Sequence, residues 1–189
     1  MKQHKNLIED LSRDLAPVAP APNVNRLGLA WLVLSAIFVA AITQLVDPLR
    51  PGAYGQLAAE PRFLLETLLG VAAIAWTGLL AFRSAVPGEL TRKFAVTGFV
   101  LMALWLAQYV AGLFSPALEP SALGKRPFWY LETMIYAIPP ILVAVFLARR
   151  LYPLHYTRTA MSLALAAGMI PALYMQIACM YAPAHILQF

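Results

Sequence analysis

The sequence has few charged residues and only one cysteine. Charged side chains make up 12% of its 189 residues and apolar ones 61%, and the mean hydropathy is +0.69. Soluble domains carry about twice this share of charge, so the composition excludes an ordinary soluble fold and is typical of a membrane protein. The single cysteine, Cys179, excludes an intramolecular disulfide. Oxidation, metal ligation, an intermolecular disulfide or simple packing remain open for it.

The motifs of common soluble enzymes are also absent. The sequence has no glycine-rich phosphate loop, no pair of histidines at helical spacing and no Cys-x-x-Cys motif. The segments between its apolar stretches are too short to form a domain with a core of its own. We therefore expect a protein that is not an enzyme and that holds no cofactor. Because no groove of basic and aromatic residues is apparent, we also expect no direct binding of nucleic acid.

Five apolar stretches are long enough to cross a bilayer, which takes about 20 helical residues. They cover residues 27–46, 63–82, 94–115, 128–148 and 157–178. Backbone groups in hydrocarbon can hydrogen-bond only to one another, so the predicted fold class is an all-α, polytopic membrane bundle with five spans. Residues 1–22 precede this transmembrane part (23–189), which ends in a stub, 179–189, too short to cross. An odd number of spans with this ending suggests a shortened chain.

Lysines and arginines are distributed unequally between the two sides of the predicted bundle. One side has Lys2, Lys5, Arg13, Arg26, Arg83, Arg92, Lys93, Arg149, Arg150 and Arg158, and the other has Arg50, Arg62, Lys125 and Arg126. Basic flanking residues are preferentially retained in the cytoplasm, so we place the N-terminus inside and the C-terminus outside. The net charge of +5 then reflects topology and contact with anionic membrane lipid.

The segment 1–22 is the part that can reach a soluble partner. Its apolar residues recur at helical spacing and are separated by charged ones, until three prolines break the pattern. The apolar residues are Leu7, Ile8, Leu11 and Leu15, and the charged ones are Glu9, Asp10, Arg13 and Asp14. This pattern predicts a short amphipathic helix on a stiff Pro/Ala tether. Its acidic face argues against a helix lying on the membrane, because anionic lipid favours Lys and Arg there.

Polar residues within the spans gather in one half of the predicted bundle. They are Gln44, Glu66, Gln108, Tyr109, Glu132, Tyr136 and Gln176. Because successive helices alternate in direction, all fall in the outer half, where Cys179 and His185 also lie, and they predict a polar cavity or lining. In one interpretation Glu66 and Glu132 lie beside Arg62 or Arg126 and stabilise helix ends. In the other, Glu66, Glu132, Cys179 and His185 form a signal-sensing site for a cation, a proton or a stress signal, with ligands suited to a borderline metal.

Prolines and small residues mark two further features of the spans. Pro139, Pro140 and Pro171 lie inside predicted helices, where kinks are expected, either as hinges or as static packing. Ala160, Ala164 and Gly168 form a stripe of small residues along one face. Such a stripe permits a close helix contact, either within the bundle or in a homodimer.

Several short segments occur in an order that points to a known family. They are LIEDLSRDLAPV (7–18), EPRFLLE (60–66), RSAVPG (83–88), the Pro139-Pro140 pair, and Cys179 followed by Pro183. In this order they resemble the NrsF-type anti-sigma factors, small integral membrane proteins that hold an extracytoplasmic-function (ECF) sigma factor at the bacterial inner membrane. The family pattern has six spans, one more than this sequence. Its members also commonly carry a second cysteine near the start of the fourth span, where residues 128–133 contain none.

The resemblance implies that the cytoplasmic helix binds the sigma factor and blocks its access to core RNA polymerase. The partner-binding residues would be Leu7, Ile8, Glu9, Asp10, Leu11, Asp14 and Leu15. We expect release when an envelope, metal or oxidative stress signal acts on the region of Glu66, Glu132 and Cys179. The alternative is a small transporter or channel subunit in which Glu66, Glu132, Gln108 and Gln176 line a pathway. That alternative predicts a flux that Glu66→Gln abolishes, and no role for residues 1–22.

Overall fold

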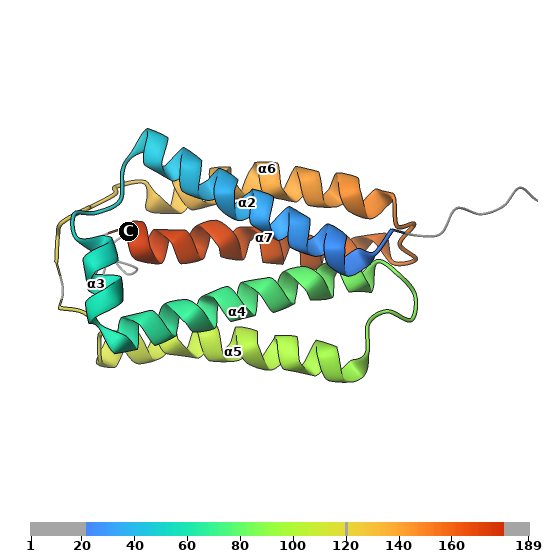
Figure 1. The fold of residues 1–189 in the computed structure, drawn as a ribbon, viewed down its shortest axis with the longest axis horizontal. Helices are drawn as coiled ribbons and strands as arrows, with labels where there is room; N and C mark the ends of the chain where they lie inside the picture. The colour runs from blue at the N-terminus through green and yellow to red at the C-terminus, as the bar shows by residue number, and fades with distance from the viewer. Residues whose placement is uncertain (1–21, 120, 180–189) are drawn as a thin grey trace, which may run out of the picture.

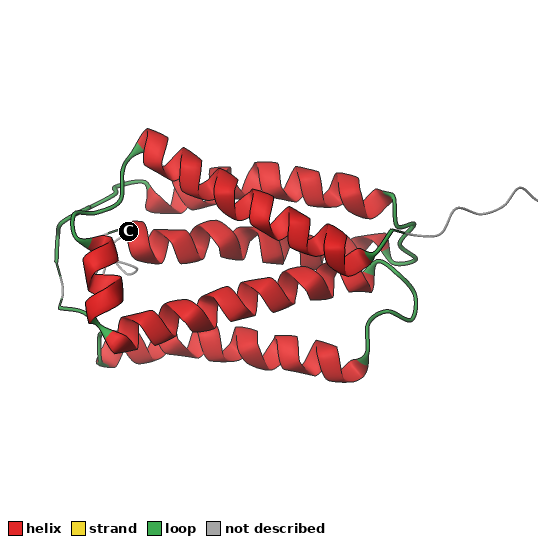
Figure 2. Ribbon diagram, in the orientation of Figure 1, coloured by secondary structure: helices red, strands yellow, loops and turns green. Residues whose placement is uncertain are grey.

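The computed structural model describes residues 22–119 and 121–179. Over these ranges it contains six helices and no strand (Figure 2). They are α2 (Val24–Val46), α3 (Ala53–Ala59), α4 (Pro61–Ser84), α5 (Arg92–Phe114), α6 (Trp129–Arg149) and α7 (Tyr156–Ala178). All except α3 are long and apolar enough to span a membrane, which confirms the all-α class and the five predicted spans. The predicted amphipathic helix and most of the C-terminal stub, including His185, lie outside the described ranges.

Local sequence explains where several helices begin. At the start of α2 the Asn23 side chain accepts hydrogen bonds from the backbone N–H groups of Asn25 and Arg26, both at 3.1 Å. These bonds satisfy N–H groups that have no partner within the helix. Thr91 caps α5 in the same way, and α4 begins at Pro61, where a missing N–H costs nothing.

Helix α3 is a correction to the sequence analysis, which treats residues 47–62 as a loop. It is only seven residues long and contains Gly55, so it gives no readable helical periodicity. Gly52 precedes it with a φ of 79°, a left-handed conformation that glycine adopts without strain. The chain therefore turns sharply between the end of α2 and this short helix.

The five long helices lie side by side, and the chain reverses direction at each connection (Figure 1). Helix α7 contacts α2, α4 and α6, whereas α5 packs chiefly against α4. Large apolar side chains such as Leu34, Phe99 and Leu142 remain exposed on the outer faces, as a surface facing lipid requires. We call the end that carries α3 the α3 end. We call the opposite end the basic end, because exposed basic side chains gather there: Arg26, Arg92, Lys93, Arg149, Arg150 and Arg158.

A glycine sets the close approach of three helices. A Cβ atom at Gly70 on α4 would lie 2.6 Å from Leu173 Cδ1 on α7 and 2.7 Å from Trp105 Nε1 on α5. A larger residue would therefore push these helices apart. By contrast, a Cβ atom at Gly168 would meet nothing within 4 Å, so the small-residue stripe makes no close helix contact at this position among the described residues. A homodimer through the stripe stays a prediction.

Helices α6 and α7 are continuous through their internal prolines. Helix α6 is continuous through Pro139 and Pro140, and α7 through Pro171. The indole N–H of Trp31 on α2 donates a hydrogen bond to the Pro140 carbonyl oxygen at 2.9 Å, and Trp31 is 1% exposed. A buried indole needs such an acceptor. This bond joins α2 to the middle of α6.

Candidate functional site

The polar side chains predicted to share one half of the bundle do lie together at the α3 end. Tyr109 on α5 donates a hydrogen bond to Gln176 Oε1 on α7 at 2.8 Å. Glu66 lies near the start of α4, at the same end of the bundle. The amide nitrogen of Gln108 is buried without a hydrogen-bond partner in the described part of the chain. Within the predicted polar lining, the bond from Tyr109 to Gln176 joins α5 to α7.

Glu66 forms an ion pair with an arginine on its own helix. Arg62 Nε lies 3.0 Å from Glu66 Oε1, one turn away along α4, and the Arg62 side chain is 44% exposed. The same guanidinium donates a hydrogen bond to the Ser115 hydroxyl at 3.0 Å and another to the Ser115 carbonyl. Ser115 caps the C-terminus of α5, where a cation offsets the negative end of the helix dipole. This arginine thus fastens α4 to the end of α5.

Glu132 forms a second ion pair, whose arginine is buried. Arg126 Nη1 lies 2.7 Å from Glu132 Oε2, with side-chain exposures of 1% for the arginine and 20% for the glutamate. Arg126 also donates hydrogen bonds to the carbonyl oxygens of Asp47 and Pro48, directly after α2, and its Nε lies 3.6 Å from Asp47 Oδ2. A buried guanidinium needs several acceptors because its charge has lost its water. Arg126 therefore joins α6 to the end of α2.

A third arginine, Arg50, holds the end of α7. Its backbone N–H donates to the Ala178 carbonyl oxygen at 3.2 Å, and its Nε–H donates to the Ile177 carbonyl oxygen at 3.1 Å. These carbonyls belong to the last turn of α7 and have no partner within the helix. Gly124 packs against the backbone of Arg50 with a φ of 77°, so the segment that leads to Arg126 crosses directly over Arg50. This role of Arg50 gives no signal in the sequence, because Ile177 lies 127 residues away along the chain.

The candidate sensing residues are placed in separate contacts. Glu66 pairs with Arg62 and Glu132 with Arg126, which confirms the ion pairs expected in the first interpretation. Cys179 is 8% exposed and caps α7, beside the carbonyls that Arg50 contacts. Among the described residues, no three His, Cys, Asp or Glu side chains lie together as metal ligands would. Because His185 is outside the described ranges, its part in a sensing site stays a prediction.

The three arginines make the α3 end a connected unit. Each arginine donates hydrogen bonds at or just beyond the C-terminal end of a different helix: Arg50 at α7, Arg62 at α5 and Arg126 at α2. A change in the charge of Glu132 would act directly on Arg126 and hence on the end of α2. Helix α2 is also the helix that continues from residues 1–22.

The fold and this site define an all-helical bundle with five potential membrane spans, tied at one end by arginines. The model of the NrsF family, described as negative regulator of sigma F, matches residues 11–188. The chain therefore belongs to the NrsF family, as the resemblance in its sequence predicts. No curated protein and no solved structure was found to match it.

Proposed function

We propose that this protein is a non-catalytic membrane anti-sigma factor whose N-terminal segment binds an ECF sigma factor in the cytoplasm. The observation that carries the proposal is the extent of the family match, which begins at residue 11 and runs to residue 188. It thus includes Leu11, Asp14 and Leu15 of the predicted amphipathic helix as well as the bundle. A negative regulator of a sigma factor needs a surface that a soluble factor can reach, and residues 1–22 are the segment suited to it.

The distribution of charge supports a cytoplasmic N-terminus and an inner-membrane location. The exposed basic side chains gather at the basic end, where α2 begins. At the α3 end, Arg50, Arg62 and Arg126 are engaged with carbonyl oxygens or carboxylates. Among the described residues, six exposed basic side chains lie at the basic end and two, Arg62 and Lys125, at the α3 end, which favours the basic end on the cytoplasmic side. Residues 1–22 would then lie in the same compartment as a sigma factor.

The chemistry of residues 7–15 supports binding by a helix that folds on its partner. A helix of about a dozen residues is marginal alone in water, so it would gain order as Leu7, Ile8, Leu11 and Leu15 enter an apolar groove. Glu9, Asp10 and Asp14 would face basic residues of a DNA-binding factor. Such charges add orientation and association rate more than affinity.

Release would begin at the α3 end. A metal, thiol or envelope stress signal that alters Glu132 or Cys179 would change the contacts of Arg126 or Arg50, and Arg126 would pass the change to α2. Shifting a two-state switch from mostly closed to mostly open takes roughly 5.5 kcal/mol of differential binding. Loss of the Glu132–Arg126 ion pair, at about 2 kcal/mol, supplies part of this. The contact of Trp31 with Pro140 would keep α2 and α6 moving together.

Co-purification of the full chain with candidate sigma factors tests the proposal. The informative variant is Leu11→Asp with Leu15→Asp, which puts two charges on the predicted apolar face. Arg13→Asp is the matched control, because Arg13 lies on the opposite face of the same helix and the substitution changes the charge by the same amount as the double variant. We expect the wild type and Arg13→Asp to retain a sigma factor and the double variant to lose it, while all three keep the same elution profile in detergent. Equal retention by all three would refute a role for this face.

A further inference from the structure

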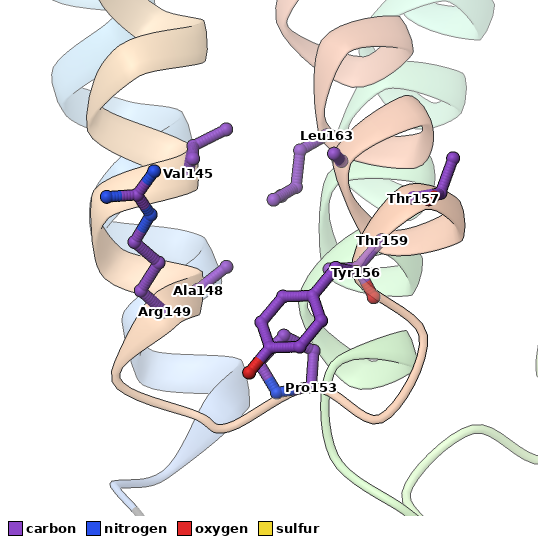
Figure 3. A pocket seen from close by; sticks show the side chains of 9 residues that line it. Val145, Ala148, Arg149, Pro153, Tyr156, Thr157, Thr159 and Leu163 are labelled. Carbon is purple, nitrogen blue, oxygen red and sulfur yellow. The ribbon is translucent and has the colours of Figure 1, made fainter.

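A cavity of about 300 Å³ lies between α6 and α7 at the basic end of the bundle (Figure 3). Its walls include Val145 and Arg149 from α6 and Tyr156, Thr159 and Leu163 from α7. This size is at the lower limit of pockets that hold small ligands. The α3 end and its arginines lie at the other end of both helices, so this cavity is separate from the candidate sensing region.

The polarity of the cavity changes with depth. Arg149 is the last residue of α6 and Tyr156 the first of α7, so both residues are anchored at the mouth, and Figure 3 shows the Arg149 guanidinium turned along α6, away from Leu163. Val145 lies one turn deeper in α6 and Leu163 about two turns deeper in α7, roughly 6 Å and 10 Å along axes that rise 1.5 Å per residue. Figure 3 shows Val145 and Leu163 on facing walls above Tyr156. A bilayer has the same sequence of polar headgroups and then hydrocarbon along its normal.

Three features of the mouth favour an anion. His155, at the N-cap position before α7, provides no side-chain cap, and the first turn of the helix has no acidic residue, so its first N–H groups are available to an anion. Thr159, 2% exposed, has a buried hydroxyl with no hydrogen-bond partner among the described residues. Arg149 is exposed and makes no ion pair with any other residue that the structure describes. A buried hydroxyl without a partner is costly, and a phosphate oxygen would satisfy it.

We propose that this cavity binds one anionic phospholipid. Its phosphate would lie at the start of α7 against Thr159, the exposed Arg149 side chain would turn towards it across the mouth, and one acyl chain would lie against Val145, Ala160 and Leu163. An amphipathic ligand fits a cavity that is polar at the mouth and apolar within, in a chain whose helices are long and apolar enough to span a membrane. The inference does not depend on sigma-factor binding, because it concerns only α6, α7 and lipid.

Native mass spectrometry of the full chain in detergent, with added phosphatidylglycerol or phosphatidylcholine, tests the site. We expect one phosphatidylglycerol to bind more tightly than phosphatidylcholine, and Arg149→Gln to weaken it about tenfold or more, since a charge-assisted bond to phosphate is lost. Arg92→Gln is the control, because it removes an exposed charge at the same end outside the cavity. Leu163→Trp fills the apolar part of the cavity and should abolish binding of phosphatidylglycerol. Thr159→Val removes the hydroxyl but keeps the shape of the side chain, and it should weaken binding.

Several results would overturn the proposal. Equal binding of the two lipids, or equal losses in Arg149→Gln and Arg92→Gln, would mean that no specific headgroup site exists. Displacement of phosphatidylglycerol by millimolar inorganic phosphate would mean that the cavity takes a free anion and not a lipid. If neither lipid binds but a peptide of residues 1–22 does, the cavity is a peptide site and the assignment to lipid is wrong.

Discussion

Replacing Glu132 by glutamine tests whether the buried ion pair with Arg126 holds the α3 end together. The two side chains are 2.7 Å apart, and the arginine is 1% exposed. Glutamine keeps the size of the side chain and one acceptor oxygen, so the substitution removes the charge and little else. Arg126 would retain the carbonyl oxygens of Asp47 and Pro48 and the Asp47 carboxylate at 3.6 Å.

The expected cost follows from this geometry. Breaking a fully buried ion pair costs about 3–5 kcal/mol, and a hydrogen bond to a charged group contributes about 1.5–3 kcal/mol. Because Asp47 remains near the guanidinium, the lower figures apply, and we expect a loss of about 2 kcal/mol in the free energy of unfolding. At roughly 2–4 °C per kcal/mol for a chain of this length, Tm should fall by about 4–8 °C.

Glu66→Gln is the matched control. It makes the same chemical change in an ion pair whose arginine is 44% exposed and one turn away on the same helix, while the two glutamates are similarly placed, at 12% exposure for Glu66 and 20% for Glu132. The comparison therefore tests the burial of the arginine. Pairs of that kind contribute about 0.5 kcal/mol or less, so Tm should change by no more than about 2 °C. Thermal unfolding of the wild type and both variants in one detergent gives the comparison. Equal losses in the two variants, or a Glu132→Gln protein as stable as the wild type, would refute the reasoning from burial.

Three further predictions concern packing and access. Gly70→Ala should lower the free energy of unfolding by about 1–3 kcal/mol, because its methyl group would overlap side chains of α5 and α7. Gly168→Ala should be neutral or slightly stabilising. Unfolding in a denaturing detergent distinguishes the two variants, and equal effects would contradict the packing of Gly70 against α5 and α7. Trp31→Phe should lower the free energy of unfolding by about 1 kcal/mol, measured in the same way, because the Pro140 carbonyl oxygen loses the indole N–H as a donor. An unchanged stability would show that this hydrogen bond contributes nothing. Cys179 should react slowly with a maleimide in the folded protein and rapidly after denaturation, and equal rates would show that its thiol is accessible.

The helical spans were predictable to within a few residues, and the reason is the bilayer. A helix that crosses hydrocarbon must be apolar over about 20 residues, so hydropathy alone locates it. The predicted stretch 27–46 corresponds to α2, Val24–Val46; the helix begins earlier because Asn23 caps it. Helix α3 escaped prediction because seven residues between two prolines carry no hydropathy signal.

The candidate site was predictable in part. Arg62 and Glu66 are four residues apart in the sequence, the spacing at which two side chains meet on a helix surface. Arg126 and Glu132 are also close along the chain, so that pair too was within reach of sequence reasoning. The bond from Arg50 to Ile177 and the bond from Tyr109 to Gln176 were not, because their partners lie far apart in the sequence.

The sequence by itself determined the five long helices, their approximate extents and the gathering of polar residues in one half of the bundle. Only the tertiary structure decided which helices are neighbours, that Glu66 and Glu132 lie in separate contacts and not in one site, and that three arginines tie the helix ends. The physical reason is that side chains facing lipid and side chains facing another helix are both apolar. Hydropathy therefore reveals that a segment spans the membrane, whereas its neighbours follow from the fit of residues such as Gly70 and Trp31.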